Sequence, residues 1–156
     1  AQVLAPIGLV LYNPGNAKKV LAPAEFEPLV PFVVGLKVVD GNRDWFTAMH
    51  AIAGNVSIGI SGHHLATGVL FGANCSYSNV AALQPRGAQQ WYKLMGSNLN
   101  AALALERRID EFWYHHVVPF IAEEHYSDMA VDKLLAAAGA WAPMNTTLRW
   151  PYRSIP

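Results

Sequence analysis

Residues 33–41 read VVGLKVVDG, an apolar run that carries a lysine, Lys37. The run is short, rich in β-branched residues and followed by a turn signal, which predicts a buried strand over residues 32–40. An ammonium in apolar surroundings is costly unless it is paired or neutralised. Lys37 is therefore either a structural ion pair, with Asp40 or a helix acid as its partner, or an amine with a chemical use.

Three more apolar runs share this pattern, and each is bounded by turn residues and followed by a helical pattern. Strands that alternate with helices at this spacing predict successive βα units and a parallel sheet. No G-x-G-x-x-G or G-x-x-x-x-G-K loop occurs, which disfavours a nucleotide-binding open sheet. Four βα units are half of an eight-unit barrel, and a half-barrel also fits a sequence that enters a strand within a few residues. The expected strands cover residues 7–13, 32–40, 55–62 and 74–80, and the helices after them cover 22–30, 42–54, 63–73 and 84–96.

The sequence beyond residue 96 is helical rather than alternating. A long helical stretch is interrupted near Pro119, and a further helix is expected between Ser127, a suitable N-cap, and Gly139, a suitable stop. The Pro- and Trp-rich tail predicts an ordered extension. The expected helices cover residues 97–126 and 127–140, and the expected division is a half-barrel over 1–97 with a helical extension of the same domain over 98–156.

Composition excludes several classes of partner. The 156 residues carry 11 basic and 11 acidic side chains, so the formal net charge is zero and no basic patch marks a nucleic-acid site. No apolar run reaches the roughly 18 residues of a membrane span, and the start AQVLAPIGLV lacks the charged leader of a signal peptide. Cys75 is the one cysteine, which rules out an internal disulfide and fits a cytoplasmic location.

Tyr12 strengthens the chemical interpretation of Lys37. It ends the strand that precedes the lysine strand, so strand adjacency predicts that its phenol lies near the amine. Carboxyl ends of parallel strands are where such folds place their sites. Burial favours a neutral amine, which attacks a carbonyl, and a neighbouring phenol can move protons for that reaction. The alternative is that Tyr12 is an aromatic core residue.

Three stretches together resemble one family. LVLYNPGNAKKVLAPAEF (residues 9–26), VVGLKVVDGNRDWF (33–46) and ISGHHLATGVLFGANCSYSNVAALQP (60–85) resemble the C-terminal half of the dihydrodipicolinate synthase / N-acetylneuraminate lyase family, and the tail TTLRWPYRSIP is similar to the family's ending. The resemblance covers essentially the whole chain. It implies an α/β fold, a parallel (β/α)8 TIM barrel, of which this chain supplies the last four βα units plus C-terminal helices.

The resemblance also implies roles, position by position. Lys37 matches the imine-forming lysine of a Gly-x-Lys motif, and Tyr12 matches the proton-relaying tyrosine of a Tyr-Asn motif. Tyr77 matches a strand-end position whose backbone carbonyl lies beside the bound oxo acid. Gly62 matches the glycine of the Ser-Gly that closes the strand before it.

Two departures from the family pattern bear on specificity. The sequence NPGNAKK replaces the segment in which the synthase branch has a carboxylate-binding arginine, and neither Lys18 nor Lys19 offers the bidentate fork of that residue. The sequence SGHH replaces an acidic pair and puts His63 or His64 at the active face, as an acid/base or a hydroxyl-binding donor. A metal site is disfavoured, because neighbouring strand residues point to opposite faces.

The resemblance implies a Schiff-base lyase or aldolase that acts on pyruvate or a related 2-oxo acid and an aldehyde, without metal or organic cofactor. It also implies a homo-oligomer, with the N-terminal half-barrel on the same or another chain. Two alternatives remain: a sugar-acid dehydratase that uses the same lysine, and a catalytically silent barrel with a binding or structural role. Cys75 lies inside the fourth expected strand, and we expect it to be a small core residue.

Overall fold

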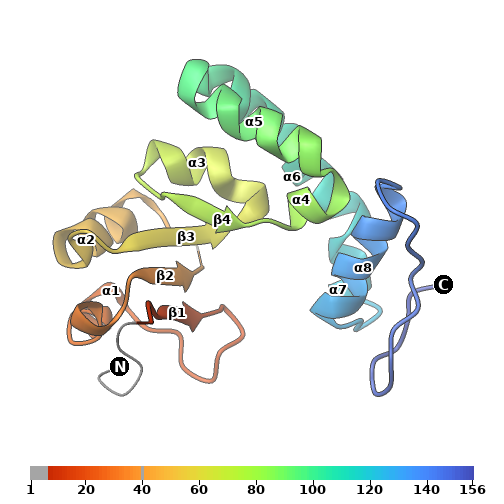
Figure 1. Cartoon of the computed structure of the whole chain (residues 1–156), viewed down its shortest axis with the longest axis horizontal. Helices are drawn as coiled ribbons and strands as arrows, with labels where there is room; N and C mark the ends of the chain where they lie inside the picture. The colour runs from red at the N-terminus through yellow and green to blue at the C-terminus, as the bar shows by residue number, and fades with distance from the viewer. Residues whose placement is uncertain (1–6, 40) are drawn as a thin grey trace. The chain divides into compact units, whose positions relative to one another are not determined.

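The computed structural model describes residues 7–39 and 41–156 (Figure 1). By its internal contacts the chain divides into two compact units, Ala1–Tyr77 and Ser78–Pro156. The first unit holds the whole sheet and the second is helical. None of the helices in the described part of the chain is both long enough and apolar enough to cross a membrane.

The first unit is built on one parallel sheet of four strands in the order β1-β2-β3-β4 (Figure 1). Every neighbouring pair is parallel, as the βα rhythm of the sequence predicts. The sheet is open within the described residues, with β1 and β4 at its edges. The strands are β1 (Val10–Asn13), β2 (Gly35–Val38), β3 (Ser57–Ser61) and β4 (Cys75–Tyr77).

Alternation along the strands gives the sheet two unlike faces. One face carries the buried aliphatic side chains of β2 and β3, among them Leu36, Ile58 and Ile60. Helix α3 packs there, because Gly68 lets its backbone approach Ile60 closely. The other side, here called the open face, is polar or small apart from Val10 and the tyrosines. By register it consists of Val10, Tyr12, Gly35, Lys37, Ser57, Gly59, Ser61, Cys75 and Tyr77.

Short helices connect the strands of the first unit. Asn42 caps α2 by accepting a hydrogen bond from the Trp45 N–H at 2.9 Å, and Phe46 and Met49 of that helix are fully buried. The connecting elements are α1 (Pro23–Phe26), the 3-10 turn η2 (Val30–Phe32), α2 (Arg43–Ala53), the 3-10 turn η3 (Gly62–His64) and α3 (Leu65–Leu70).

The second unit packs its helices around a separate apolar cluster. Val117, Val131 and Leu135 form its centre, and Ile155 brings the C-terminal tail into the same core. The tail is thereby an ordered extension, as predicted. Ser127 caps the last helix through its hydroxyl, which accepts from the Ala130 N–H at 3.3 Å. The helices are α4 (Asn79–Leu83), α5 (Pro85–Ser97), α6 (Leu99–His116), α7 (Val118–Ala122) and α8 (Asp128–Ala138).

The structure corrects several predicted boundaries. All four strands are shorter than the apolar runs, because the flanking apolar residues lie in turns; Phe32, for example, belongs to η2. The fourth strand ends at Tyr77, since Ser78 caps the unpredicted helix α4 through a hydrogen bond from the Ala81 N–H. The predicted break near Pro119 is confirmed between α6 and α7. The division at residues 97 and 98 stays a prediction, and α5 lies in the second compact unit.

Candidate functional site

Lys37 and Tyr12 lie side by side on the open face. The two residues are register partners in β1 and β2, near the carboxyl ends of both strands. The Lys37 Nζ lies over the Tyr12 ring, 4.0 Å from its centroid. A cation at that distance from an aromatic face is attracted by the ring quadrupole. The adjacency predicted from strand order is thus present as a direct side-chain contact.

Tyr77 contributes a second ring to the same amine. Its centroid lies 4.9 Å from the Lys37 Nζ, although Tyr77 ends β4 and β3 lies between that strand and β2. Gly59 of β3 makes this reach feasible. A Cβ added at Gly59 would lie 3.6 Å from Tyr77 Cε2, so the tyrosine ring lies close to the bare backbone of that residue. The contact of the Tyr77 side chain with Lys37 is not evident from the sequence pattern.

The environment of Lys37 corrects the expectation of a fully buried lysine. The residue is half-buried, because its side chain lies on the open face while Leu36 and Val38 fill the packed face. Tyr12, expected as a possible core aromatic, is 57 % exposed. The alternative pairing with Asp40 falls outside the described residues. Among the described residues, no ion pair involves Lys37, and the two tyrosine rings supply the contacts to its charge.

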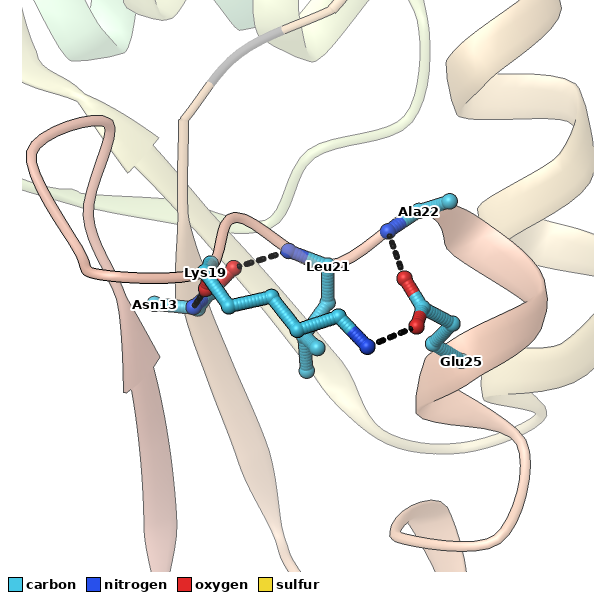
Figure 2. A network of polar contacts seen from close by, with 5 residues as sticks. All are labelled: Asn13, Lys19, Leu21, Ala22 and Glu25. Carbon is cyan, nitrogen blue, oxygen red and sulfur yellow. Dashed lines mark hydrogen bonds and ion pairs between the residues drawn. The ribbon is translucent and has the colours of Figure 1, made fainter.

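Asn13, the second residue of the Tyr-Asn pair, holds the loop that follows β1. Its side-chain Nδ2 donates to the Lys19 carbonyl at 2.9 Å, and its Oδ1 accepts from the Leu21 N–H at 2.8 Å (Figure 2). Both bonds are partly shielded from water, and Asn13 itself is buried. Because alternate strand residues face opposite ways, Tyr12 reaches the amine while Asn13 fixes the backbone behind it.

Lys19 points toward α1 rather than serving as a free cation. Its ammonium pairs with the Glu25 carboxylate, which also accepts from the Ala22 N–H at 2.9 Å (Figure 2). The bond from Lys19, followed by that from Ala22, lowers the pKa of Glu25 below its ordinary value of 4.5. Lys18 is exposed and Lys19 is engaged, so of the two lysines considered as replacements for the missing arginine only Lys18 keeps an uncommitted ammonium among the described contacts.

Gly62 and His63 lie directly after β3, at the carboxyl end of the strand that neighbours the lysine strand. Gly62 is buried and begins the 3-10 turn η3, which also contains both histidines. The His63 and His64 rings lie 4.2 Å apart between centroids. The strand rule that sends neighbours to opposite faces therefore does not apply to this pair, because β3 has already ended at Ser61.

Cys75 corrects another expectation. The thiol was expected in the core, but the residue is exposed at the start of β4. The register aligns it with Gly59 and through Gly59 with Lys37, in one row across the open face. Within residues 7–39 and 41–156, no group of three or more His, Cys, Asp or Glu side chains is placed to hold a metal ion.

The second unit contains an apolar cavity of about 230 Å³ between α4 and α6. Its lining is almost entirely hydrocarbon and includes Leu83, Ile109 and Phe112, with the Arg108 side chain as its one charged member. Small polar oxo acids are bound by convergent polar groups, which this lining does not offer. The chemically suitable constellation is therefore the one on the open face.

On the open face the structure brings together an amine, two phenols and the small residues between them. An amine at the end of a parallel strand can attack a carbonyl, and a phenol against it can exchange protons with the adduct. Of the residues singled out in the sequence, Lys37 is in direct contact with Tyr12 and with Tyr77. Gly62 and His63 lie at the end of the adjacent strand.

Solved structures with a similar fold identify the fold to which this site belongs. No protein-family model matches the chain, and no curated protein does so by sequence. Solved structures do match. A protein of Coccidioides immitis assigned to the dihydrodipicolinate synthase family superposes with a TM-score of 0.72 at 18% identity, covering 100% of this chain and 52% of the other. The dihydrodipicolinate synthase of Bacteroides thetaiotaomicron gives 0.73 at 19% identity, with 97% and 52% covered.

A third matching structure contains a bound ligand. YagE of E. coli, a prophage protein of the dihydrodipicolinic acid synthase family solved in complex with pyruvate, superposes with a TM-score of 0.74 at 18% identity, covering 96% of this chain and 51% of YagE. The chain thus spans about half the length of the proteins it matches, which is consistent with their C-terminal half. Within the described residues the barrel is not closed. The parallel sheet with its helices therefore has the fold of half a dihydrodipicolinate synthase family barrel.

Proposed function

We propose that the chain provides the imine-forming lysine of a lyase or aldolase that acts on pyruvate or a related 2-oxo acid. The observation that carries the proposal is the contact between the Lys37 amine and the Tyr12 ring, at the carboxyl ends of two paired parallel strands. That end of the sheet is where (β/α)8 enzymes collect their reacting groups. The lysine is in contact with aromatic side chains, and it is only half-buried, so a small substrate can reach it.

The chemistry follows from the amine. The lone pair of Nζ forms a bond to the 2-oxo carbon, and the carbonyl π pair moves to oxygen, which takes up a proton while Nζ releases one. The resulting carbinolamine loses its hydroxyl as water when a second proton arrives, and a C=N⁺ iminium forms. Tyr12, whose ring contacts Nζ, is the proposed carrier of these protons.

The iminium is the electron sink for the following step. Its positive nitrogen accepts the electron pair released when a bond at the neighbouring carbon breaks, and it returns that pair when a bond to an aldehyde forms. This chemistry is complete without a metal or organic cofactor. The fold supports the assignment, since a structural neighbour with a similar fold, YagE, was solved in complex with pyruvate.

The proposed enzyme includes a complementary half-barrel on the same or another chain. β1 and β4 are edge strands within the described residues, and the open face between them carries the reactive amine. Edge strands are ready to pair, and closure of a barrel removes them. We further propose that the complete enzyme is a cytoplasmic homo-oligomer.

The test is covalent trapping. The intact protein is incubated with pyruvate, reduced with borohydride and digested, and each lysine peptide is examined by mass spectrometry. Reduction of the iminium leaves a stable secondary amine, which is expected on Lys37 and is expected to be missing from Lys37→Arg. Lys93→Arg, a change at an exposed lysine of α5, is the matched control and should label like the wild type. Labelling spread equally over all lysines, or none with any 2-oxo acid, would overturn the proposal in favour of a catalytically silent barrel.

A dehydratase for sugar-derived oxo acids is the second candidate. The observation that favours it is the His63–His64 pair in η3, directly after the strand next to Lys37. An imidazole there could take a proton from a hydroxyl-bearing substrate while the same lysine holds the imine. The candidates are separated by product analysis: loss of water from a 2-oxo sugar acid supports the dehydratase, and release of pyruvate supports the aldolase.

A further inference from the structure

We propose that Tyr77 is a positioning residue whose ring holds the Lys37 side chain against Tyr12. The expected effect of Tyr77 on the reaction rate rests on the proposed function. The contact between its ring and Lys37 can be tested separately. A role of this kind belongs to the aromatic side chain. It is distinct from the backbone-carbonyl role that the family resemblance implies for the same position.

The geometry shows an amine between two rings from different strands. Nζ lies 4.0 Å from the Tyr12 centroid and 4.9 Å from the Tyr77 centroid, and both distances are within the roughly 6 Å range of a cation–π contact. Tyr77 is 53 % exposed, so core packing does not dictate the position of its ring. Its place over the lysine therefore depends on the contact with the cation and on the space that the strand between them leaves.

Gly59 provides that space. It aligns with Lys37 on one side and with Cys75 on the other, and it presents no side chain on the open face. A Cβ at this position would already stand 3.1 Å from the Cys75 Sγ and 3.6 Å from Tyr77 Cε2. A branched side chain would extend further into the volume that the ring now uses. Gly59 and Tyr77 thus act together, and either a branched side chain at residue 59 or loss of the ring at residue 77 should release the lysine.

The contact bears on a particular step of the proposed reaction. Nζ is positively charged in the ammonium and again in the iminium, whereas the carbinolamine between them is neutral. Ring faces stabilise the two charged states and leave the neutral one unaffected. The charge effect of the ring is therefore similar before and after the reaction, and the cost of losing the ring is one of position: an amine no longer held against Tyr12 should form the iminium about three- to tenfold more slowly, the fold-change that corresponds to the free energy of a partly exposed cation–π contact.

The geometric test uses nuclear magnetic resonance. The intact protein is reductively methylated with ¹³C-formaldehyde, which keeps each lysine cationic, and the Lys37 signal is identified as the one missing from Lys37→Arg. Because two ring faces shield Nζ, the Lys37 methyl signal should lie upfield of the other lysine signals. Tyr77→Phe, which keeps the ring, should retain this shift, while Tyr77→Leu should lose part of it. An unchanged Lys37 signal in Tyr77→Leu would overturn the proposal.

Gly59→Val gives an independent readout, because it alters neither ring nor amine. It should move the Lys37 methyl signal in the same direction as Tyr77→Leu. Gly59→Ala, whose Cβ makes an ordinary contact with the Tyr77 ring, should move it less. Circular dichroism and thermal unfolding of each variant show whether it is folded. A folded Gly59→Val protein whose Lys37 signal matches the wild type would contradict the assigned role of the glycine.

The kinetic test measures the rate of pyruvate trapping on Lys37. Tyr77→Phe should react at nearly the wild-type rate and Tyr77→Leu three- to tenfold more slowly. Equal losses in both variants would assign the effect to the hydroxyl and overturn the positioning role. If wild-type Lys37 traps no oxo acid, the proposed function fails, and the resonance experiment still decides whether Tyr77 holds the amine.

Discussion

The Lys37 amine rests on the face of the Tyr12 ring because the two residues are direct register partners in adjacent parallel strands. Side chains of register partners project from the same face, so the contact is a consequence of strand pairing and needs no special loop. One hydrogen-bonded ladder therefore sets both the strand pairing and the distance between the Lys37 amine and the Tyr12 ring.

Tyr12→Phe separates the ring of this residue from its hydroxyl. The ring should continue to hold Lys37, so the ring-current shift of the lysine methyl signal should persist. The rate of pyruvate trapping should fall about a hundredfold, since a positioned proton carrier contributes roughly that much. Borohydride trapping time courses measure the rate. A Tyr12→Phe protein that traps pyruvate at the wild-type rate would remove Tyr12 from the proton pathway.

Asn13→Ala should destabilise the first unit by about 1–3 kcal/mol. The change removes two partly shielded hydrogen bonds and leaves the Leu21 N–H and the Lys19 carbonyl without that partner. Urea unfolding of wild type and variant gives the free-energy difference. Asn16→Ala, in the same loop but exposed, is the matched control and should change stability by less than about 0.5 kcal/mol.

The lowered pKa of Glu25 predicts that the stability of the folded chain decreases at low pH. Its folded pKa is lowered by Lys19 and by the Ala22 N–H, so the ionised carboxylate favours the folded state. That contribution is present above the unfolded pKa and is lost as the pH falls through the folded pKa. Unfolding measured between about pH 7 and about pH 3 should therefore show wild type and Glu25→Gln converging at low pH. Glu27→Gln, an exposed change just beyond α1, should leave the wild-type profile intact.

Gly139→Ala should cost more than about 2 kcal/mol in the second unit. A Cβ there would overlap the Leu83 carbonyl oxygen, which is backbone and cannot rotate away. Gly96→Ala is the matched control, because its Cβ would meet nothing within 4 Å, and it lies inside α5. That change should be neutral or stabilise by up to about 1 kcal/mol through helix propensity. Equal unfolding midpoints for the two variants would contradict the close approach of α4 and α8.

The strand order, the parallel pairing and the Lys37–Tyr12 contact were predictable, because each follows from apolar runs that alternate with helical patterns. The strand ends were not, since Phe32 and Val33 are as apolar as the strand yet lie outside it. The fourth strand was extended too far because Ser78 can continue a strand or cap a helix, and the structure uses it as a cap.

The Tyr77 contact and the loop-holding role of Asn13 were missed for different reasons. Tyr77 reaches Lys37 across β3, where Gly59 leaves room for the ring. The pattern of residue types along a single strand does not show how far a side chain reaches across the neighbouring strand. Asn13 could have been suspected, since a polar residue on the packed face of a strand needs partners. The expectation of a fully buried lysine was wrong, because an apolar run does not show which face of the strand is covered by other elements.

Cys75 places a thiol on the same row as the Lys37 amine, with Gly59 between them. A thiol-directed fluorophore therefore attaches to this chain at one defined point, on the face that a complementary half-barrel would enclose. Its emission would report the polarity at that face directly, so the binding of a complementary half-barrel could be followed optically.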